Sequence, residues 1–271
     1  MSWRDRLRAA LNAPSTTSER TTGKPTSSNG ASSLHLNWSP VPPNVHAVSI
    51  DLTIVEPPTT NDLYFWAMQA SFTSGNHSHG AGHIGLQHIS GYPNNAAVNW
   101  GGYHDGGGEL AGTESPLPSS RGNVNTRDYH WRAGTSYRLE IAKIGADDLG
   151  HQPAASTDSS WRGSVIDLAS NERTLIRELK CPGTELRHIV MWSEVFAACD
   201  APPVSVRWSN PTAYVGATNS ETWTPGRMHI SYQRVEDGGC SNTVSMRDPE
   251  HQAALIQRTN SARSNRRGDV I

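Results

Sequence analysis

Three consecutive stretches in which bulky side chains alternate with small or polar ones constrain the fold of this chain most. They are LYFWAMQASF at 63–72, HIGLQHI at 83–89 and AAVNWGGY at 96–103, separated by SGNHSHGAG and SGYPNN, which are rich in turn-forming residues. Alternation with a period of two is typical of a strand that buries one face. The chain is therefore predicted to place three antiparallel strands side by side, joined by two turn-rich loops.

The alternation gives these strands one bulky face and one sparse face. The bulky face is predicted to pack in the core and consists of Tyr64, Trp66, Met68, Phe72, Ile84, Leu86, Val98 and Trp100. The sparse face is small and rich in amides, and its members are Ala67, Gln69, Ser71, Gly85, Gln87, Asn99, Gly101 and Tyr103. A glycine inside a strand often marks a place where another group approaches the backbone closely. The sparse face is therefore the candidate ligand surface, and an ordinary solvated sheet face is the alternative.

The same patterns predict further strands along the rest of the chain. Their ranges are 46–55, 136–144, 161–168, 174–179, 187–196, 204–208 and 228–235. Residues 248–258, DPEHQAALIQR, fit either the start of a helix with Pro at its first position or a last strand, and the strand is favoured. About ten short strands without βαβ alternation predict an all-β fold of two packed antiparallel sheets, a jelly-roll or concanavalin-like sandwich.

Composition divides the chain into one folded domain and two tails. Residues 1–33 are predicted to be a disordered tail that begins with a short basic amphipathic helix, because 14–33 is nearly free of apolar side chains. Residues 34–258 form the predicted sandwich domain, and 259–271 a second disordered tail. The stretch 104–128 is rich in Gly, Ser, Pro and Asn and is predicted to be a loop.

Charge and cysteine content limit the expected partners and compartment. A net charge of −2 over 271 residues gives no general attraction to nucleic acid, and no apolar run is long enough to cross a membrane. No export signal is recognised, so a cytoplasmic location is expected, with Cys181, Cys199 and Cys240 as thiols. If one pair bridges, Cys199 with Cys240 is the expected pair, because both follow strand ends. The oligomeric state is left open.

Three histidines in HSHGAGH form the sharpest chemical signal in the sequence. An HxH pair in extended conformation points His77 and His79 to one side, and together with His83 they could bind zinc, iron, copper or nickel through neutral imidazole. The pattern lacks the glutamate that follows in metal sites of the cupin type. A glycine-rich loop without a metal is the alternative, and no other cofactor is predicted.

Glu194 in MWSEVF is the strand carboxylate that the sequence places in an aromatic setting. It shares a strand side with Trp192, and both face the sparse surface if their strand joins the same sheet. A glycosidase would need two carboxylates flanking a cleft, so Glu194 is the catalytic candidate only if the protein is an enzyme. In the alternative packing, Trp192 is buried and Glu194 pairs with an arginine such as Arg207.

The ligand surface is predicted to bind a glycan or another small polar ligand, because neutral amides beside an aromatic plane suit a sugar. The residues assigned to it are Gln69, Gln87, Asn99, Tyr103, Trp192 and Glu194. Noncatalytic, lectin-like carbohydrate binding is the leading prediction. The alternatives are a glycan-active or histidine-dependent metal enzyme on the same fold, and a protein-interaction domain.

The order of several motifs resembles that of a bacterial family that carries domain of unknown function 3472. The motifs are YFWAMQASF, GHIGLQHI, NWGGY, DYHWRAGTSYRLEI, WRGSVIDL, HIVMWSEVFAACD, VSVRWSNP and GGCSNT, of which WSEVF and GGCSNT are the most specific. The resemblance covers residues 34–258 and implies a lectin-like jelly roll and glycan contact. It also implies secreted relatives, whereas no signal sequence is recognised here.

Overall fold

The structure is a computed structural model that describes residues 19–144, 160–216 and 221–271. This part contains fifteen β-strands and one short 3₁₀ helix, η1 (Pro93–Asn95), in the turn before the third central strand. The helix predicted near the N-terminus lies outside the described residues. Within the described part, no helix is long and apolar enough to cross a membrane.

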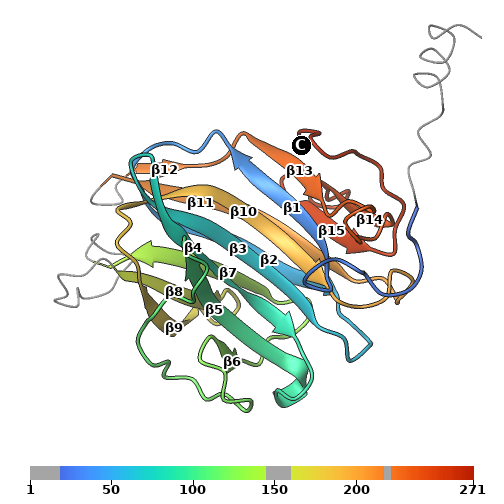
Figure 1. The fold of residues 1–271 in the computed structure, drawn as a ribbon, viewed down its shortest axis with the longest axis horizontal. Coiled ribbons are helices and arrows are strands. Elements are labelled where there is room, and N and C mark those ends of the chain that lie inside the picture. The colour runs from blue at the N-terminus through green and yellow to red at the C-terminus, as the bar shows by residue number, and fades with distance from the viewer. Residues whose placement is uncertain (1–18, 145–159, 217–220) are drawn as a thin grey trace, which may run out of the picture.

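Two antiparallel sheets form the fold (Figure 1). The first sheet contains, in spatial order, β13 (Arg227–Tyr232), β1 (Ser32–Ser39), β10 (Glu185–Val195), β3 (Tyr64–Ser74), β4 (His77–His88), β5 (Ala96–His104) and β6 (Thr126–Asp128). The second contains β14 (Thr243–Arg247), β15 (Leu255–Thr259), β11 (Ser205–Val215), β2 (Val45–Glu56), β7 (Ser136–Lys143), β8 (Ser160–Asp167) and β9 (Glu172–Lys180), with β12 (Glu221–Trp223) paired to β11. The predicted all-β sandwich is confirmed.

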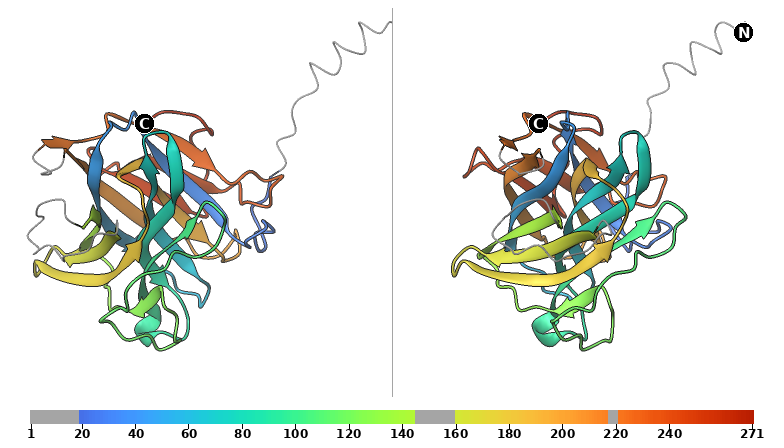
Figure 2. Two further views of the ribbon diagram at one scale, coloured as in Figure 1. Left: turned by 60° about the vertical axis from the view of Figure 1, so that its left-hand side comes forward. Right: turned by 90° about the vertical axis from the view of Figure 1, so that its left-hand side faces the viewer.

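The core lies between the two sheets, which face each other as twisted layers (Figure 2). The bulky face predicted for the central strands is buried there, and Trp66 and Trp100 are at most 1% exposed. In register, Trp66 lies opposite Leu86, and Ile84 lies opposite Trp100. Because the side chains of a strand alternate between its faces, this register directs the sparse residues to the outer face of the first sheet.

The loop predicted before the second central strand is instead the first half of β4. Ser74 pairs with His77 across the two-residue turn formed by Gly75 and Asn76, and Gly75 has a φ of 58°. Pairing then continues past an irregularity next to His79. This segment consists of histidine, serine, glycine and alanine, so it shows no alternation of apolar and polar side chains. Its backbone hydrogen bonds to β3 do not require such a pattern.

The segment 248–258 resolves into a turn followed by a strand. The Asp248 carboxylate accepts hydrogen bonds from the backbone N–H groups of Glu250 and His251. This is how an aspartate begins a helix, but the chain turns back after one turn and enters β15, where Leu255 is buried. The strand favoured by the sequence is confirmed.

Both tails depart from the prediction where they are described. Ile271 and Asp269 accept hydrogen bonds from the backbone of β13, and Figure 1 shows the C-terminal segment beside that strand. At the other end, the Thr26 N–H donates to the carbonyl of Gly238. Backbone hydrogen bonds hold these segments, and a composition poor in apolar residues does not reveal such pairing.

Cys199 and Cys240 form a disulfide with Cα atoms 5.6 Å apart, whereas Cys181 is free and buried. The expectation of three thiols is therefore wrong, and the pair named as the alternative is the one that forms. Cys199 follows β10 and Cys240 follows β13, and both strands flank β1. The order of strands in the sheet therefore brings the segments that follow β10 and β13 close together.

Candidate active site on the outer face of the first sheet

The register places the predicted surface residues on one face of the first sheet. Trp192, Ala67, Gly85 and Asn99 lie in one row across β10, β3, β4 and β5. A second row contains Glu194, Phe65, Gln87, Ala97 and Asp128, and a third contains Val190, Gln69, His83 and Gly101. Tyr103 lies one row further along β5, opposite Ala81.

This face is more covered than the sequence suggests. Gln87, Asn99 and Trp192 are only 6–8% exposed, whereas Tyr103 is 50% exposed. The Asn99 Nδ2 group donates to the Thr126 hydroxyl of β6 at 2.8 Å, whereas its Oδ1 is buried without a hydrogen-bond partner among the described residues. The amides at the centre of the predicted sugar surface are therefore largely withdrawn from solvent.

The two glycines of the face accommodate protein groups rather than a ligand. A Cβ atom on Gly101 would lie 2.9 Å from Cγ of Asn125, which covers this position from the loop before β6. A Cβ atom on Gly85 would lie 2.1 Å from the Trp66 carbonyl oxygen and 2.7 Å from Cβ of Ala67. The groups that approach these two glycines closely are therefore parts of the protein itself.

An aromatic group beside Glu194 forms the most distinctive cluster on this face. The rings of Phe65 and Trp192 meet edge to face at 4.7 Å, and His83 lies 5.7 Å from Phe65 and 5.9 Å from Trp192. We call Phe65, His83, Trp192, Glu194 and Asn29 the Glu194 cluster. The sequence missed Phe65, although two consecutive aromatic residues in a strand must point to opposite faces.

The Glu194 carboxyl is partly buried and is held by an amide. Its Oε1 accepts a hydrogen bond from Nδ2 of Asn29 at 3.1 Å. Burial raises the pKa of Glu194 above the usual glutamate range, and the Asn29 hydrogen bond offsets part of the rise. Arg207, the partner considered in the alternative packing, binds Asp248 instead. Among the described residues, Glu194 has no cationic partner within ion-pair distance.

Two histidines beside Trp192 have lowered pKa values. Burial lowers the pKa of His83 to about 4. Burial and the positive charge of Arg267 lower the pKa of His35, which lies opposite Trp192 on β1, to about 4. Burial therefore raises the pKa of the Glu194 carboxyl while it lowers the pKa of both imidazoles.

The three histidines of HSHGAGH do not form a metal site. The rings of His77 and His79 are 4.5 Å apart, but Nε2 of His79 is hydrogen-bonded to the Ser74 hydroxyl at 3.0 Å. His83 lies further along β4 and packs on Phe65 and Trp192. In the described ranges, no group of three His, Cys, Asp or Glu side chains suits a metal ion. The irregular pairing next to His79 breaks the alternation on which the prediction depended.

Gln87 is the second polar group in the row of Glu194. Its Oε1 is buried and has no hydrogen-bond partner among the described residues. Phe65 lies between Gln87 and Glu194, so their Cα atoms are two strand spacings, or about 10 Å, apart. The next carboxylate in the row, Asp128, lies two strands beyond Gln87 and binds the Ser120 hydroxyl at 2.7 Å.

Comparisons with known proteins give likenesses in fold. No family model matches the chain, and no curated protein matches it. A scytalido-glutamic peptidase, solved with a peptide-based transition-state analogue, is similar over 88% of this chain and 98% of its own, with 9% identity and a TM-score of 0.43. SCP-B of the eqolisin peptidase family, solved with the tripeptide Ala-Ile-His, gives the same coverage and identity and a TM-score of 0.41.

These findings correct the leading prediction from the sequence, noncatalytic lectin-like carbohydrate binding. Two of its central amides, Gln87 and Asn99, are buried, and protein groups fill the space beside both glycines. The outer face is a partly covered sheet surface on which burial raises the pKa of one carboxyl, Glu194.

Proposed function

We propose that this protein hydrolyses peptide bonds in mildly acidic solution and that Glu194 is its catalytic carboxyl. The observation that carries the proposal is the state of that side chain. It lies partly buried beside Phe65 and Trp192, its pKa is raised, and no described cation neutralises it. A carboxyl with a shifted pKa on an accessible face is a candidate for acid and base catalysis.

One carboxyl of this kind can supply both proton transfers of the reaction. The ionised Glu194 takes a proton from a water molecule as that water attacks the carbonyl carbon. The neutral acid then gives the proton to the departing amine nitrogen as the C–N bond breaks. A raised pKa brings the two forms into balance in mildly acidic solution, and the neutral His35 and His83 do not compete for the proton.

Peptide hydrolysis also requires a donor for the negative charge that develops on the carbonyl oxygen. We assign this role to the side-chain Nε2 group of Gln87, which is a hydrogen-bond donor and lies in the row of Glu194, two strands away. Phe65 and Trp192, between and beside these two polar groups, offer apolar contact for a substrate side chain.

The same row argues against glycoside hydrolysis by two carboxylates. Glycosidases place these carboxylates about 5 to 10 Å apart. Asp128 is four strand spacings, about 19 Å, from Glu194 in the described sheet, and it is engaged by Ser120. One carboxyl with one amide is the combination that the row provides.

Cleavage of denatured casein between pH 3 and pH 8, followed by the release of acid-soluble peptides, tests the proposal. We expect cleavage that Glu194→Gln reduces at least about 100-fold, the usual scale for loss of acid–base catalysis. Glu172→Gln, at an exposed glutamate of β9, is the matched control and should cleave at the wild-type rate. Absence of cleavage by the wild type, or wild-type rates for Glu194→Gln, would refute it.

A further inference from the structure

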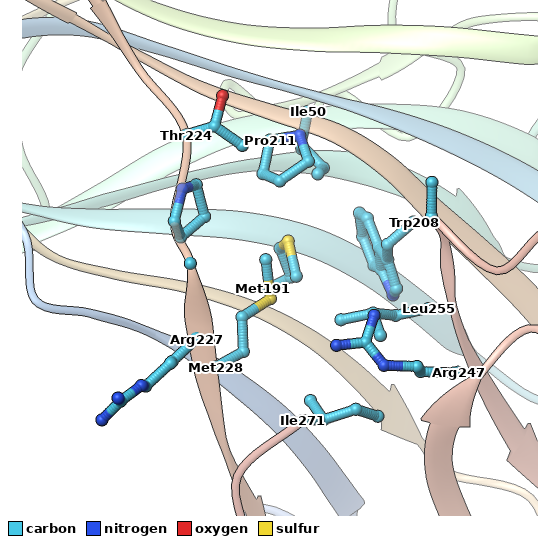
Figure 3. Close-up of a pocket in the computed structure, with 13 residues that line it drawn as sticks. Ile50, Met191, Trp208, Pro211, Thr224, Arg227, Met228, Arg247, Leu255 and Ile271 are labelled. Carbon is cyan, nitrogen blue, oxygen red and sulfur yellow. The ribbon is translucent and has the colours of Figure 1, made fainter.

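A second site lies in the core, on the opposite side of β10 from the Glu194 cluster. It is a cavity of about 120 Å³ between the two sheets (Figure 3). Met191 and Met228 line it from the first sheet, and Ile50, Trp208 and Leu255 line it from the second. All five side chains are buried, so the interior of the cavity is apolar.

The mouth of this cavity carries positive charge. Arg227 and Arg247 both lie at the rim, and in Figure 3 they point in different directions. The Arg247 guanidinium extends over the cavity beside Leu255 and Trp208, whereas the Arg227 side chain points away from it. Within the described ranges, Arg247 donates to the Gln252 carbonyl at 3.4 Å and forms no ion pair. One unneutralised cation therefore faces the opening of an apolar cavity.

We propose that this cavity binds a small molecule that has an apolar body and a single anionic end, such as a monocarboxylate of about six carbon atoms. An apolar cavity of about 150 Å³ holds benzene, so a volume slightly below that suits a short alkyl chain. The two methionines can adjust their rotamers to the shape of the chain. The carboxylate would remain at the mouth and accept charge-assisted hydrogen bonds from Arg247.

Isothermal titration calorimetry of the full chain with hexanoate tests this site, with hexan-1-ol and hexylamine as ligands of matched length. We expect hexanoate to bind more tightly than the alcohol, and the amine to bind least. Arg247→Gln should weaken hexanoate binding about tenfold or more, because a hydrogen bond to a charged group is lost, and should leave hexanol unchanged. Arg121→Gln, at an exposed arginine outside this cavity, is the matched control and should bind all three ligands as the wild type does.

A second variant tests the position of the site without altering the buried wall. Ala253 is exposed at the rim, and Ala253→Phe would close the mouth. It should abolish binding of both hexanoate and hexanol, while the melting temperature without ligand stays within a few degrees of the wild type. Failure of hexanoate to bind, equal effects of the two arginine variants, or unchanged binding in Ala253→Phe would overturn the proposal. Glu194→Gln should retain hexanoate binding, so this test is independent of peptide hydrolysis.

Discussion

At the scale of single residues, the strand side of Glu194 could be predicted from the sequence, whereas its burial and its hydrogen-bond partner could not. The period of two places Glu194 and Trp192 on the same side of their strand, and the structure has them there. Asn29, which holds the carboxyl, comes from a segment that composition assigns to a disordered tail. The raised pKa depends on burial and on this distant amide, so alternation within one strand could not predict it.

Removal of the Asn29 side-chain amide should raise the pKa of Glu194. The Asn29 hydrogen bond favours the ionised carboxyl, so Asn29→Ala is expected to raise the pKa of Glu194 further. Titration of the side-chain carboxyl by ¹³C NMR in wild-type and variant protein measures the shift. Asn37→Ala, an amide on the neighbouring part of β1, provides the control. A lower pKa in Asn29→Ala would contradict the assigned contact.

The ionised Glu194 carboxyl should lower the free energy of unfolding at neutral pH. Because the folded-state pKa of Glu194 is raised, the folded protein holds this proton more tightly than the unfolded chain does. The wild type should therefore lose stability as the pH rises from the usual glutamate pKa through the raised one. Glu194→Gln removes the ionisation and should have the larger free energy of unfolding at pH 7, by up to about 1 kcal/mol for a partly exposed group. Urea denaturation at pH 4 and pH 7 measures the difference, which should vanish at the lower pH.

At the scale of elements, the sequence predicts strands well where apolar and polar residues alternate. It predicts them poorly where only backbone hydrogen bonds hold the strand in the sheet. Strands are found at all three central stretches, β15 occupies the end of the 248–258 segment, and the bulky face is buried. The first half of β4, however, is made of histidine, serine, glycine and alanine. Its position is determined by a two-residue turn and by hydrogen bonds to β3, which leave no hydrophobic pattern to recognise.

Gly85 shows how closely β3 and β4 approach. A methyl group at this position would overlap the Trp66 carbonyl oxygen, which is part of the backbone and cannot rotate away. We expect Gly85→Ala to reduce the free energy of unfolding by about 2 kcal/mol, the usual cost of overpacking. Gly226→Ala is the control, because no atom lies within 4 Å of its Cβ position. Chemical denaturation that gives equal stabilities for the two variants would show that the strands can separate to admit the methyl group.

At the scale of the whole molecule, the described segments on both sides of the predicted domain complete the sandwich. Segments on both sides of the predicted domain pair with it, and the Cys199–Cys240 disulfide ties the end of β10 to the segment after β13. Sheet order decides that pairing, because β1 lies between the two strands. The order of strands in a sandwich depends on contacts between residues far apart in the sequence. The sequence therefore indicated which two cysteines could pair, but it could not establish that they form a disulfide.

The disulfide should contribute a large share of the stability of this fold. It closes a loop with a sequence separation of 41, for which loop-closure entropy alone gives about 4 kcal/mol. A thiol count on unreduced, denatured protein should give one free group, Cys181, instead of three. Replacing both bridging cysteines with serine should lower the free energy of unfolding by about 2 to 4 kcal/mol, whereas Cys181→Ser tests the buried thiol apart from the bridge. Since disulfides persist in oxidising surroundings, the wild type but not the double variant should lose this stability when a reductant is added. A count of three thiols, or equal melting temperatures with and without reductant, would show that the two chain ends are held by backbone pairing alone.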